Sequence, residues 1–285
     1  MTTDWTPALY SRFENERTRP AADLLARVPL ETPRSVVDLG CGPGNSTELL
    51  ATRFPAARML GCDTSATMLA AARKRLPSVT FEQRDISEWS ASEPADLIFA
   101  NASLQWVPDH PRLMPRLLGA LTPGGALAVQ MPDNLEEASH VLMRETALEP
   151  RFAALIGDPN RLRRRILSEQ RYYDLLAPLA DVMIWRTTYY HPLERAAEIV
   201  QWLRSTGLRP FLEPLAPEFQ AQFLDDYERR LESAYPGRAD GKRLLAFPRL
   251  FIVARPRPPS DCSAPPRRTD LNAAPLQCSP EFGTT

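Results

Sequence analysis

A glycine-rich turn in the stretch Val36 to Thr47 constrains the fold of this chain more than any other feature. The apolar residues at 36 and 37 indicate a buried strand, the glycines at 40, 42 and 44 indicate a tight turn, and a helical pattern begins at Asn45. A strand, a glycine turn and a helix in this order place bare backbone and a helix N-terminus beside a ligand. The stretch therefore predicts a ligand site at this turn.

Two common nucleotide-binding turns do not match this spacing. A phosphate-binding loop of the Walker type ends in Gly-Lys-Ser/Thr, and this turn contains no lysine. In a dinucleotide-binding turn the third glycine comes three residues after the second, whereas here it comes after two. Asp38, inside the end of the strand, would repel a pyrophosphate, but it can accept a hydrogen bond from an ammonium group.

The string Asp38-Leu39-Gly40-Cys41-Gly42-Pro43-Gly44 resembles motif I of class I S-adenosylmethionine-dependent methyltransferases. The plain alternative is an ordinary turn between a strand and a helix, which the length of the string and the pattern after it disfavour. The resemblance implies S-adenosylmethionine as the cofactor and S-adenosylhomocysteine as its product.

Strands and helices alternate through the first half of the chain. The expected strands are residues 34–39, 58–62, 79–83, 95–100 and 126–131. Helical patterns separate several of them, beginning at Asn45 and at Ser65 and covering Leu113 to Leu121. This alternation predicts an α/β fold with a mostly parallel, doubly wound sheet. With two later strands, 183–190 and 244–255, the resemblance implies a Rossmann-like seven-stranded sheet whose final strand is antiparallel.

Four candidate ligand groups follow four of these strands. Gly40, Asp63, Asp85 and Asn101 all stand at predicted strand C-termini. Ligands of open α/β sheets bind beyond the strand C-termini, where the strand order reverses. We therefore expect the four groups to converge on one crevice.

Each part of the cofactor can be matched to a residue type. Asp63 can accept from both ribose hydroxyls, and Asp85 can accept from the adenine amino group while Ile86 packs on the ring. Aromatic and carbonyl groups suit the cationic sulfur, and Arg19 can bind the carboxylate. The residues expected to bind the cofactor are Tyr10, Arg19, Asp38, Gly40, Cys41, Gly42, Asn45, Asp63, Thr64, Met68, Asp85, Ile86 and Asn101.

The bulk properties exclude several other classes of function. The chain has 285 residues with 34 basic and 35 acidic side chains, a balance that gives no case for nucleic acid as a bulk partner. No apolar run reaches the roughly 18 residues of a membrane span, and the start of the chain shows no export signal. The four cysteines lack zinc-finger or disulfide-framework spacing, so we expect no metal and a reducing cytoplasm. We expect a monomer.

The second half of the chain carries mostly helical patterns, at 134–148, 168–179 and 192–235. An insertion before the last strand would lie above the sheet edge and form a lid over the crevice. A run of arginines at 161 and 163–165 is interpreted as a solvated helix face or loop. The expected division is an N-terminal helical segment at 1–30, a cofactor-binding core at 31–132, a cap with the last two strands at 133–255, and a disordered tail at 256–285.

Several later strings resemble a narrower family, the trans-aconitate methyltransferases. The resemblance covers about residues 4–255 and rests on five strings outside motif I. These are Asn101-Ala102-Ser103-Leu104-Gln105-Trp106, Met131-Pro132-Asp133-Asn134, Trp185-Arg186-Thr187-Thr188-Tyr189-Tyr190-His191, Ser205-Thr206-Gly207-Leu208-Arg209-Pro210 and Phe247-Pro248-Arg249-Leu250-Phe251-Ile252-Val253-Ala254-Arg255.

The narrower resemblance implies methyl transfer to a carboxylate of a small tricarboxylic acid, trans-aconitate, giving a monomethyl ester. A carboxylate is ionised at neutral pH and needs no general base, so catalysis reduces to positioning and desolvation. No residue is assigned as a chemical catalyst; Asn101, Trp106, Tyr190 and His191 are expected to position the reactants. The residues expected to bind substrate are Trp106, Arg186, Tyr189, Tyr190, His191, Arg209 and Arg249.

Two alternatives stay open from the sequence. A carboxyl methyltransferase could instead act on another small acid or on a malonyl-carrier thioester, for which the arginine run would be the landing surface. A non-catalytic cofactor-binding protein is the alternative from a different class. A base methyltransferase is disfavoured because Asn-Ala-Ser-Leu follows the fourth strand, in place of an Asn/Asp-Pro-Pro-Tyr motif.

Overall fold

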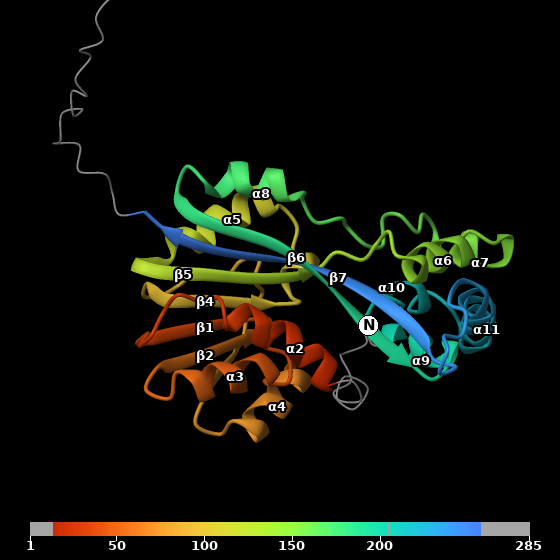
Figure 1. Ribbon diagram of the computed structural model, residues 1–285, viewed down its shortest axis with the longest axis horizontal. Coiled ribbons are helices and arrows are strands. Elements are labelled where there is room, and N and C mark those ends of the chain that lie inside the picture. Colours follow the sequence, from red (N-terminus) through yellow and green to blue (C-terminus); the bar gives the residue numbers. More distant parts are fainter. Residues whose placement is uncertain (1–13, 205, 258–285) are drawn as a thin grey trace, which may run out of the picture.

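A seven-stranded sheet runs through the middle of the molecule (Figure 1). In the computed structural model, residues 14–204 and 206–257 are described. The strand order is β3-β2-β1-β4-β5-β7-β6, and β7 is antiparallel to both of its neighbours. The strands are β1 (Ser35–Leu39), β2 (Arg58–Asp63), β3 (Thr80–Gln83), β4 (Ala95–Asn101), β5 (Leu121–Pro132), β6 (Ala180–Leu193) and β7 (Arg243–Pro256). This confirms the predicted fold class, including the antiparallel final strand.

Helices cover both faces of this sheet. The helices α2 (Glu14–Leu25) and α3 (Asn45–Arg53) lie on one face, and α5 (His110–Gly119) and α8 (Glu169–Leu176) lie on the other. The helix α4 (Ala66–Arg75) packs beside β2 and β3 on the α3 side. Two-sided cover is what a doubly wound parallel sheet requires, because both faces of its strands are apolar.

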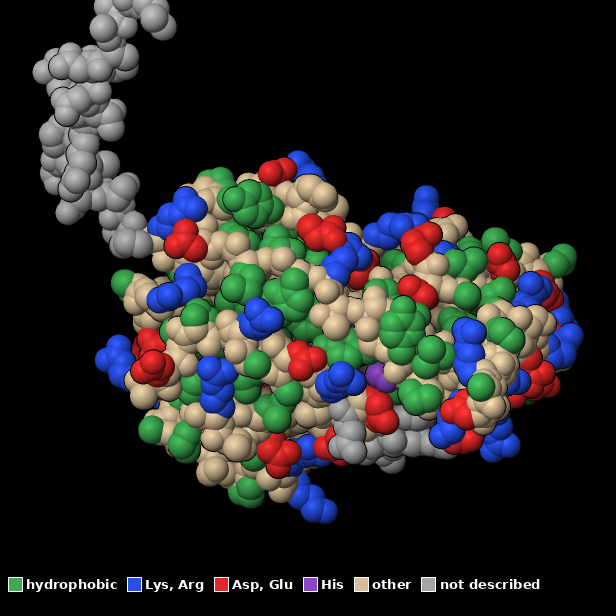
Figure 2. Space-filling view, in the orientation of Figure 1, with side chains coloured by type: hydrophobic (Ala, Val, Ile, Leu, Met, Phe, Trp, Pro, Cys, Tyr) green, Lys and Arg blue, Asp and Glu red, His purple; other side chains and the backbone are tan. Residues whose placement is uncertain are grey.

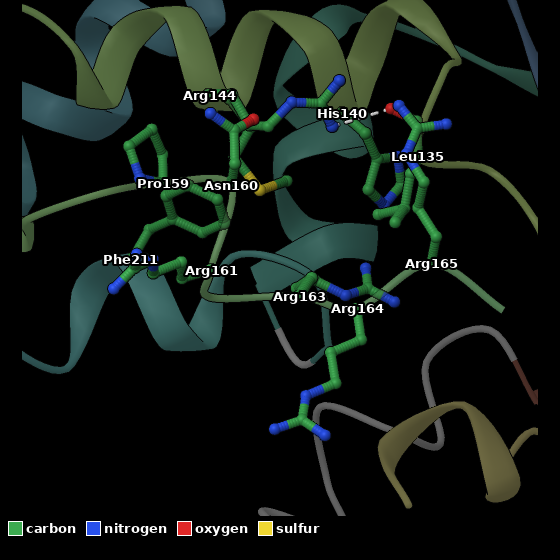
Figure 3. Close-up of a pocket in the computed structure, with 11 residues that line it drawn as sticks. Leu135, His140, Arg144, Pro159, Asn160, Arg161, Arg163, Arg164, Arg165 and Phe211 are labelled. Atoms are coloured by element: carbon green, nitrogen blue, oxygen red, sulfur yellow. Dashed lines mark hydrogen bonds between the residues drawn. The ribbon is translucent and has the colours of Figure 1, made fainter. Parts of the chain in front are cut away.

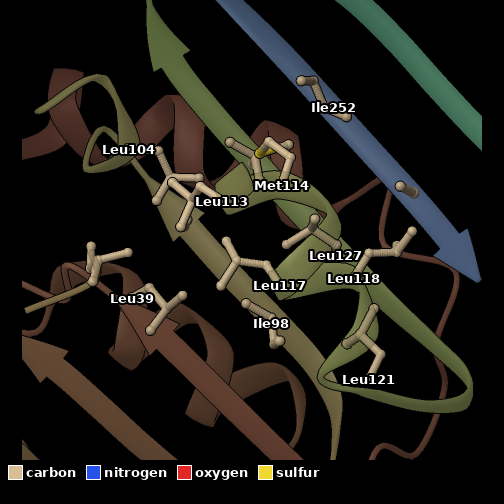
Figure 4. Packing of buried hydrophobic residues seen from close by; sticks show 14 of the residues in the cluster. Leu39, Ile98, Leu104, Leu113, Met114, Leu117, Leu118, Leu121, Leu127 and Ile252 are labelled. Atoms are coloured by element: carbon tan, nitrogen blue, oxygen red, sulfur yellow. The ribbon is translucent and has the colours of Figure 1, made fainter. Parts of the chain in front are cut away.

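Successive residues of the central strands pack into two different cores. In β4, Leu97 and Phe99 join α2 and α3, while Ile98 and Ala100 join α5 and α8. Figure 4 shows the second core, where Leu113 and Leu117 of α5 lie over the strands. The period-two alternation of side chains along a strand produces this split.

A further apolar core, separate from the two that cover the sheet, lies beyond the C-terminal edge of the parallel strands. It is built from helices between β5 and β7, and we call this part the cap (Figure 1). The cap helices are α6 (Ala138–Ala147), α7 (Pro150–Ile156), α9 (Ala196–Arg204), α10 (Arg209–Leu212) and α11 (Pro217–Ala234). The strands β6 and β7 reach it, since β7 pairs with β5 only from Arg249 onward while β6 pairs with β7 as far as Arg243. Leu245 and Phe247 of this ribbon belong to the cap core.

Several predicted boundaries differ from the structure. The fifth strand begins at Leu121 rather than at residue 126, because Leu121 pairs with Ala95 before a register shift. A Cβ on Gly125 would stand 2.9 Å from the carbonyl oxygen of Asp96, so a glycine suits this position. The helix expected from residue 134 begins at Ala138, and α7 was not predicted. Most of the expected tail lies outside the described residues. No helix among those described is long and apolar enough to cross a membrane.

Candidate active site

The glycine turn after β1 lies at the C-terminal edge of the sheet and is held by close backbone packing. Gly40, Gly42 and Gly44 all have positive φ, at 75°, 55° and 93°. A Cβ on Gly40 would stand 2.2 Å from the Cβ of Ser103, whose hydroxyl donates to the carbonyl oxygen of Leu39 at 2.7 Å. Gly40 is therefore required both by its conformation and by the close approach of the segment after β4.

Asp63, at the end of β2, anchors this turn from the neighbouring strand. The backbone N–H of Gly42 donates to its Oδ2 at 2.9 Å, and the N–H of Ser65 donates to its Oδ1 at 2.9 Å. Ser65 in turn caps α4 by accepting from the N–H of Met68. Each carboxylate oxygen can accept more than one hydrogen bond, so both can also accept from a ligand hydroxyl.

Asp38 lies beneath the turn rather than in an open cavity. It is 1% exposed, and the hydroxyls of Ser46 and Thr47 both donate to its Oδ2 at 2.7 Å. Burial raises the pKa of this carboxyl to about 6, against the two hydroxyl hydrogen bonds, which lower it. Among the residues that the structure describes, none is a hydrogen-bond partner of its Oδ1.

A cavity of about 750 Å³ opens along this edge of the sheet, and we call it the edge cavity. It collects residues from the ends of β1, β2, β3 and β4. The predicted site residues that line it are Gly40, Gly42, Asp63, Thr64, Met68, Asp85, Ile86, Asn101, Trp106 and Arg209. The converging groups expected at the strand C-termini therefore do meet in one space.

Four other residues predicted to bind the cofactor lie elsewhere. Cys41 is buried beneath the turn, and Asn45 donates to the carboxylate of Glu14 at 2.6 Å. Arg19 lies over the ring of Tyr189, and neither Arg19 nor Asp38 lines the edge cavity. Tyr10 lies outside the described residues.

A smaller hollow of about 80 Å³ adjoins the edge cavity, and we call it the inner chamber. The two share Ala102, Trp106 and Thr206. The rest of its lining comes from six separate parts of the chain: Arg17, Gln105, Pro132, Asn134, His140, Arg163, Trp202, Leu203, Phe247 and Arg249. Of the described residues that line it, three are arginines and none is acidic, so its lining offers positive charge and several hydrogen-bond donors.

Each of the three arginines contacts a neighbouring ring, amide or backbone carbonyl group. The Nη1 of Arg249 donates to the side-chain oxygen of Gln130 at 3.1 Å, and its guanidinium lies over the ring of Phe247. Arg17 donates to the carbonyl oxygen of Trp202 at 3.1 Å. Arg163 lies over the ring of Trp106, with 4.8 Å from guanidinium carbon to ring centroid. Burial lowers the pKa of Arg163 to about 10, which leaves it charged at neutral pH.

The residues predicted on β6 do not line either space. Tyr189 and His191 face α2 and the cap, where the Tyr189 hydroxyl donates to Asp23 and His191 lies behind Trp202, 4.4 Å between ring centroids. Tyr190 points to the opposite side and is 59% exposed. Arg186, on the same side as Tyr190, is ion-paired to Asp133 and Glu169. Of the substrate residues predicted from the last two strands, Arg249 alone lines the inner chamber.

The sequence analysis missed most of the inner chamber. Arg17 was read as part of an N-terminal helix, and Arg163 as part of a solvated loop. The sequence predicts no role for Asn134 or His140, both of which line the inner chamber. The signal that could have found Arg163 is the run of arginines with few acids around it. No pattern in the sequence marks Arg17 or His140, because their chamber forms only when distant segments meet.

The histidine of the inner chamber is neutral at physiological pH. His140 is 2% exposed, and burial, with the charges of Arg163 and Arg144, holds its pKa well below the usual value. Burial and the nearby Arg249 and Arg19 likewise lower the pKa of His191 to about 4. Both rings are therefore hydrogen-bonding groups rather than cations near neutral pH.

Comparisons with known proteins identify the family of the chain. A family model described as a methyltransferase domain matches residues 36–125. The trans-aconitate 2-methyltransferase of Methylobacterium radiotolerans is 61% identical over 255 residues, which are 88% of this chain and 98% of that protein. The enzyme of the same name from Variovorax paradoxus is 60% identical over 254 residues, again 88% and 98%.

Solved structures with much lower identity share the fold. The YcgJ protein of Bacillus subtilis has a TM-score of 0.56 at 11% identity, covering 84% of this chain and 99% of that one. Phosphoethanolamine N-methyltransferase 2 of Haemonchus contortus, in complex with S-adenosyl-L-methionine, has a TM-score of 0.51 at 19% identity, covering 84% of this chain and 53% of that one. These likenesses concern the sheet and its helices alone.

Proposed function

The chain belongs to the trans-aconitate 2-methyltransferase family, and from that membership we propose that it methylates a carboxylate of trans-aconitate with S-adenosylmethionine. The observation that carries the proposal is the inner chamber, where three arginines from three separate parts of the chain face one small space. The acceptor has three carboxylates, and guanidinium groups bind carboxylates with directed, charge-assisted hydrogen bonds.

The edge cavity fits the proposed cofactor. Gly42 lines it, and no atom of the described residues lies within 4 Å of the place where a Cβ would stand, so a side chain there would occupy ligand space. Asp63 offers carboxylate oxygens for the ribose hydroxyls, and Asp85 and Ile86 offer an acceptor and an apolar surface for the adenine. The Oδ1 of Asn101 is buried there without a hydrogen-bond partner among the described residues. We assign these residues to the cofactor.

The chain's own residues would bind, orient and dehydrate the acceptor. When bound, S-adenosylmethionine supplies a methyl group on a cationic sulfur, and a carboxylate oxygen takes that methyl while S-adenosylhomocysteine leaves. Arg17, Arg163 and Arg249 would hold the acceptor's carboxylates, leaving one of them directed past Ala102 and Trp106 toward the edge cavity. No general base is needed, because the attacking group is already an anion.

The experiment is methyl transfer from S-adenosylmethionine carrying a labelled methyl group. We expect the purified protein to label trans-aconitate far faster than citrate or malonyl thioester on a carrier protein, and mass spectrometry to show one added methyl. Preferential labelling of the malonyl carrier would overturn the proposed acceptor. Cofactor binding by titration calorimetry, with no labelling of any small acid, would favour a non-catalytic protein.

Asp63→Asn is expected to weaken S-adenosylmethionine binding about tenfold, with little change in the KM for trans-aconitate. The amide keeps one acceptor oxygen but replaces the other with a donor, so one charge-assisted hydrogen bond is lost, worth roughly 1.5 kcal/mol. Titration calorimetry gives the dissociation constant. Glu82→Gln, one strand away and outside the edge cavity, is the matched control. Equal weakening in both variants would contradict the assignment of Asp63.

A further inference from the structure

A third cavity lies on the cap side of the inner chamber, and neither the cofactor nor the acceptor accounts for it. It has a volume of about 560 Å³, and five arginines line it, so we call it the arginine cavity. Figure 3 shows that most of its arginines follow one another along the loop between α7 and α8, while His140 and Arg144 come from α6 above them. Its lining is Leu135, His140, Met143, Arg144, Pro159, Asn160, Arg161, Arg163, Arg164, Arg165 and Phe211.

The arginine cavity carries an unbalanced positive charge. Glu136 is within 4 Å of Arg144 and Arg165, and Asp158 is within 4 Å of Arg161, but none of the described residues that line the cavity is acidic. For Arg163 and Arg164, no acidic partner is found in the part of the chain that the structure describes. By contrast, basic and acidic side chains are interspersed over the face of the molecule in Figure 2. The positive charge is therefore a local property of this loop.

The arginine cavity is separated from the inner chamber by two side chains that line both spaces, His140 and Arg163. Trp106 similarly lines both the inner chamber and the edge cavity, and Arg163 stacks on it. The three hollows therefore form a series, with the inner chamber in the middle. The edge cavity lies at one end of the series, and the arginine cavity lies at the other.

The wall between the inner chamber and the arginine cavity is polar and incompletely hydrogen-bonded. The Nδ1 of His140 is 3.2 Å from the hydroxyl of Ser139, but its buried Nε2 has no partner among the described residues. A Cβ on Gly207 would be 3.2 Å from this Nε2 and 3.2 Å from Nη1 of Arg163. A side chain at position 207 would therefore crowd both nitrogens.

We propose that the arginine cavity is the entrance through which a polycarboxylate acceptor reaches the inner chamber, and that Arg163 is the gate between them. The proposal rests on the proposed function. A cofactor in the edge cavity would obstruct passage beside Trp106, so the acceptor needs a second opening. Arg163 leaves the ring of Trp106 to pair with an entering carboxylate and then remains as one wall of the filled chamber.

Electrostatics gives this entrance a measurable signature. A cleft lined by charges of one sign raises the rate at which oppositely charged ligands arrive, by about 10- to 1,000-fold. The effect on a trivalent anion weakens as salt shortens the screening length, from about 30 Å at 0.01 M to about 10 Å at 0.1 M. An outer arginine should therefore affect the capture of substrate, and it should leave the turnover of bound substrate unchanged.

Arg164→Glu tests the entrance, because Arg164 lines the arginine cavity and is absent from both other spaces. We expect kcat/KM for trans-aconitate at low ionic strength to fall about tenfold, with kcat and the dissociation constant of S-adenosylmethionine unchanged. The difference from the wild type should shrink as salt is raised. Arg255→Glu is the matched control, an exposed arginine at the end of β7 remote from the cap, and it should behave as the wild type.

Gly207→Ala tests the gate. The added methyl would crowd Arg163 and His140, so we expect kcat/KM for trans-aconitate to fall about tenfold with cofactor binding unchanged. Gly119→Ala is its control, since a Cβ there meets nothing within 4 Å. Melting temperatures show whether each variant is folded.

The outcomes separate the entrance from the function. If Arg164→Glu has the same kcat/KM as the wild type at low salt, or if kcat/KM falls equally in Arg255→Glu, the proposed entrance is wrong. The proposed function would survive either result, provided that the wild type methylates trans-aconitate. Wild-type kcat/KM in folded Gly207→Ala would overturn the gate. Absence of methyl transfer to trans-aconitate by the wild type would overturn the proposed function and the entrance with it.

Discussion

Arg249→Met is expected to lower kcat/KM for trans-aconitate about 100- to 1,000-fold, equivalent to about 3–4 kcal/mol of lost transition-state binding. Arg249 is 4% exposed and lines the inner chamber, where its charge has little competition from water. Methionine keeps much of the apolar stem and removes the charge and the donors. Because Arg249 does not line the edge cavity, the dissociation constant of S-adenosylmethionine should change by less than about threefold.

The control for this variant is Arg186→Met on the neighbouring strand. Arg186 is opposite Leu250 in the β6–β7 register, and its ion pairs with Asp133 and Glu169 lie outside the inner chamber. Its loss should change kcat/KM by less than about threefold. Steady-state kinetics on both variants measures the two losses in kcat/KM, and melting temperatures show that each variant is folded. Similar losses in both would mean that the inner chamber is not the acceptor site.

Asp38→Asn is expected to stabilise the protein by up to roughly 3 kcal/mol at pH 8 and to have little effect near pH 4. Burial raises the pKa of this carboxyl from 3.8 to about 6, so the native state holds the proton more tightly than the unfolded chain. The stability associated with the protonated form is present below about pH 4 and is lost as pH rises through 6. The amide carries no charge and avoids that loss.

Urea unfolding at pH 4 and pH 8 measures the effect. Asp96→Asn is the control, and its stability should change in the opposite direction. Partial burial raises the pKa of Asp96, but hydrogen bonds from Thr122, Arg34 and Ser35 outweigh it and lower that pKa. That variant should be less stable than the wild type at pH 8. The same stability change at both pH values in Asp38→Asn would rule out a charge effect.

The stabilised variant should bind the cofactor less well. Asp38 lies under the glycine turn, and its Oδ1 has no hydrogen-bond partner within the described ranges. Although Asp38 does not line the edge cavity, we propose that its charge stabilises the ammonium of S-adenosylmethionine across the glycine turn, so the neutral amide should raise the dissociation constant about tenfold. A charged group that costs stability and supports binding is a common feature of functional sites. Unchanged cofactor affinity would remove Asp38 from the binding residues.

The fold and the edge cavity were accessible from the sequence because local patterns determine them. Alternating apolar strands and helices specify a doubly wound sheet, and the C-termini of parallel strands share one edge. Asp63, Asp85 and Asn101 could therefore be placed together without knowing how any helix packs. The glycines of motif I also predict a tight turn after the first strand, and the positive φ angles of Gly40 and Gly42 agree with that prediction.

The inner chamber could not be predicted because it depends on packing between distant segments. Alternation along β6 correctly separates Tyr190 from Tyr189 and His191, but the sequence does not say which side faces the chamber. In the structure neither side does, because the chamber forms at β7 and the cap. An arginine in a helix, such as Arg17, looks like a surface residue until the cap encloses it.

The position of β7 between β5 and β6 has a consequence for the order in which the protein can be assembled during synthesis. β6 is made before β7, yet β7 is its only neighbour in the described sheet. In a growing chain the strands from β1 through β5 can pair with one another, but β6 has no partner until β7 is made. Arg249 lies on β7, the strand that joins β6 to β5. A chain still missing β7 can therefore form the glycine turn while lacking a complete anion chamber. The growing chain could therefore bind the cofactor before it could bind the acceptor, and more than a hundred residues would be synthesised in between.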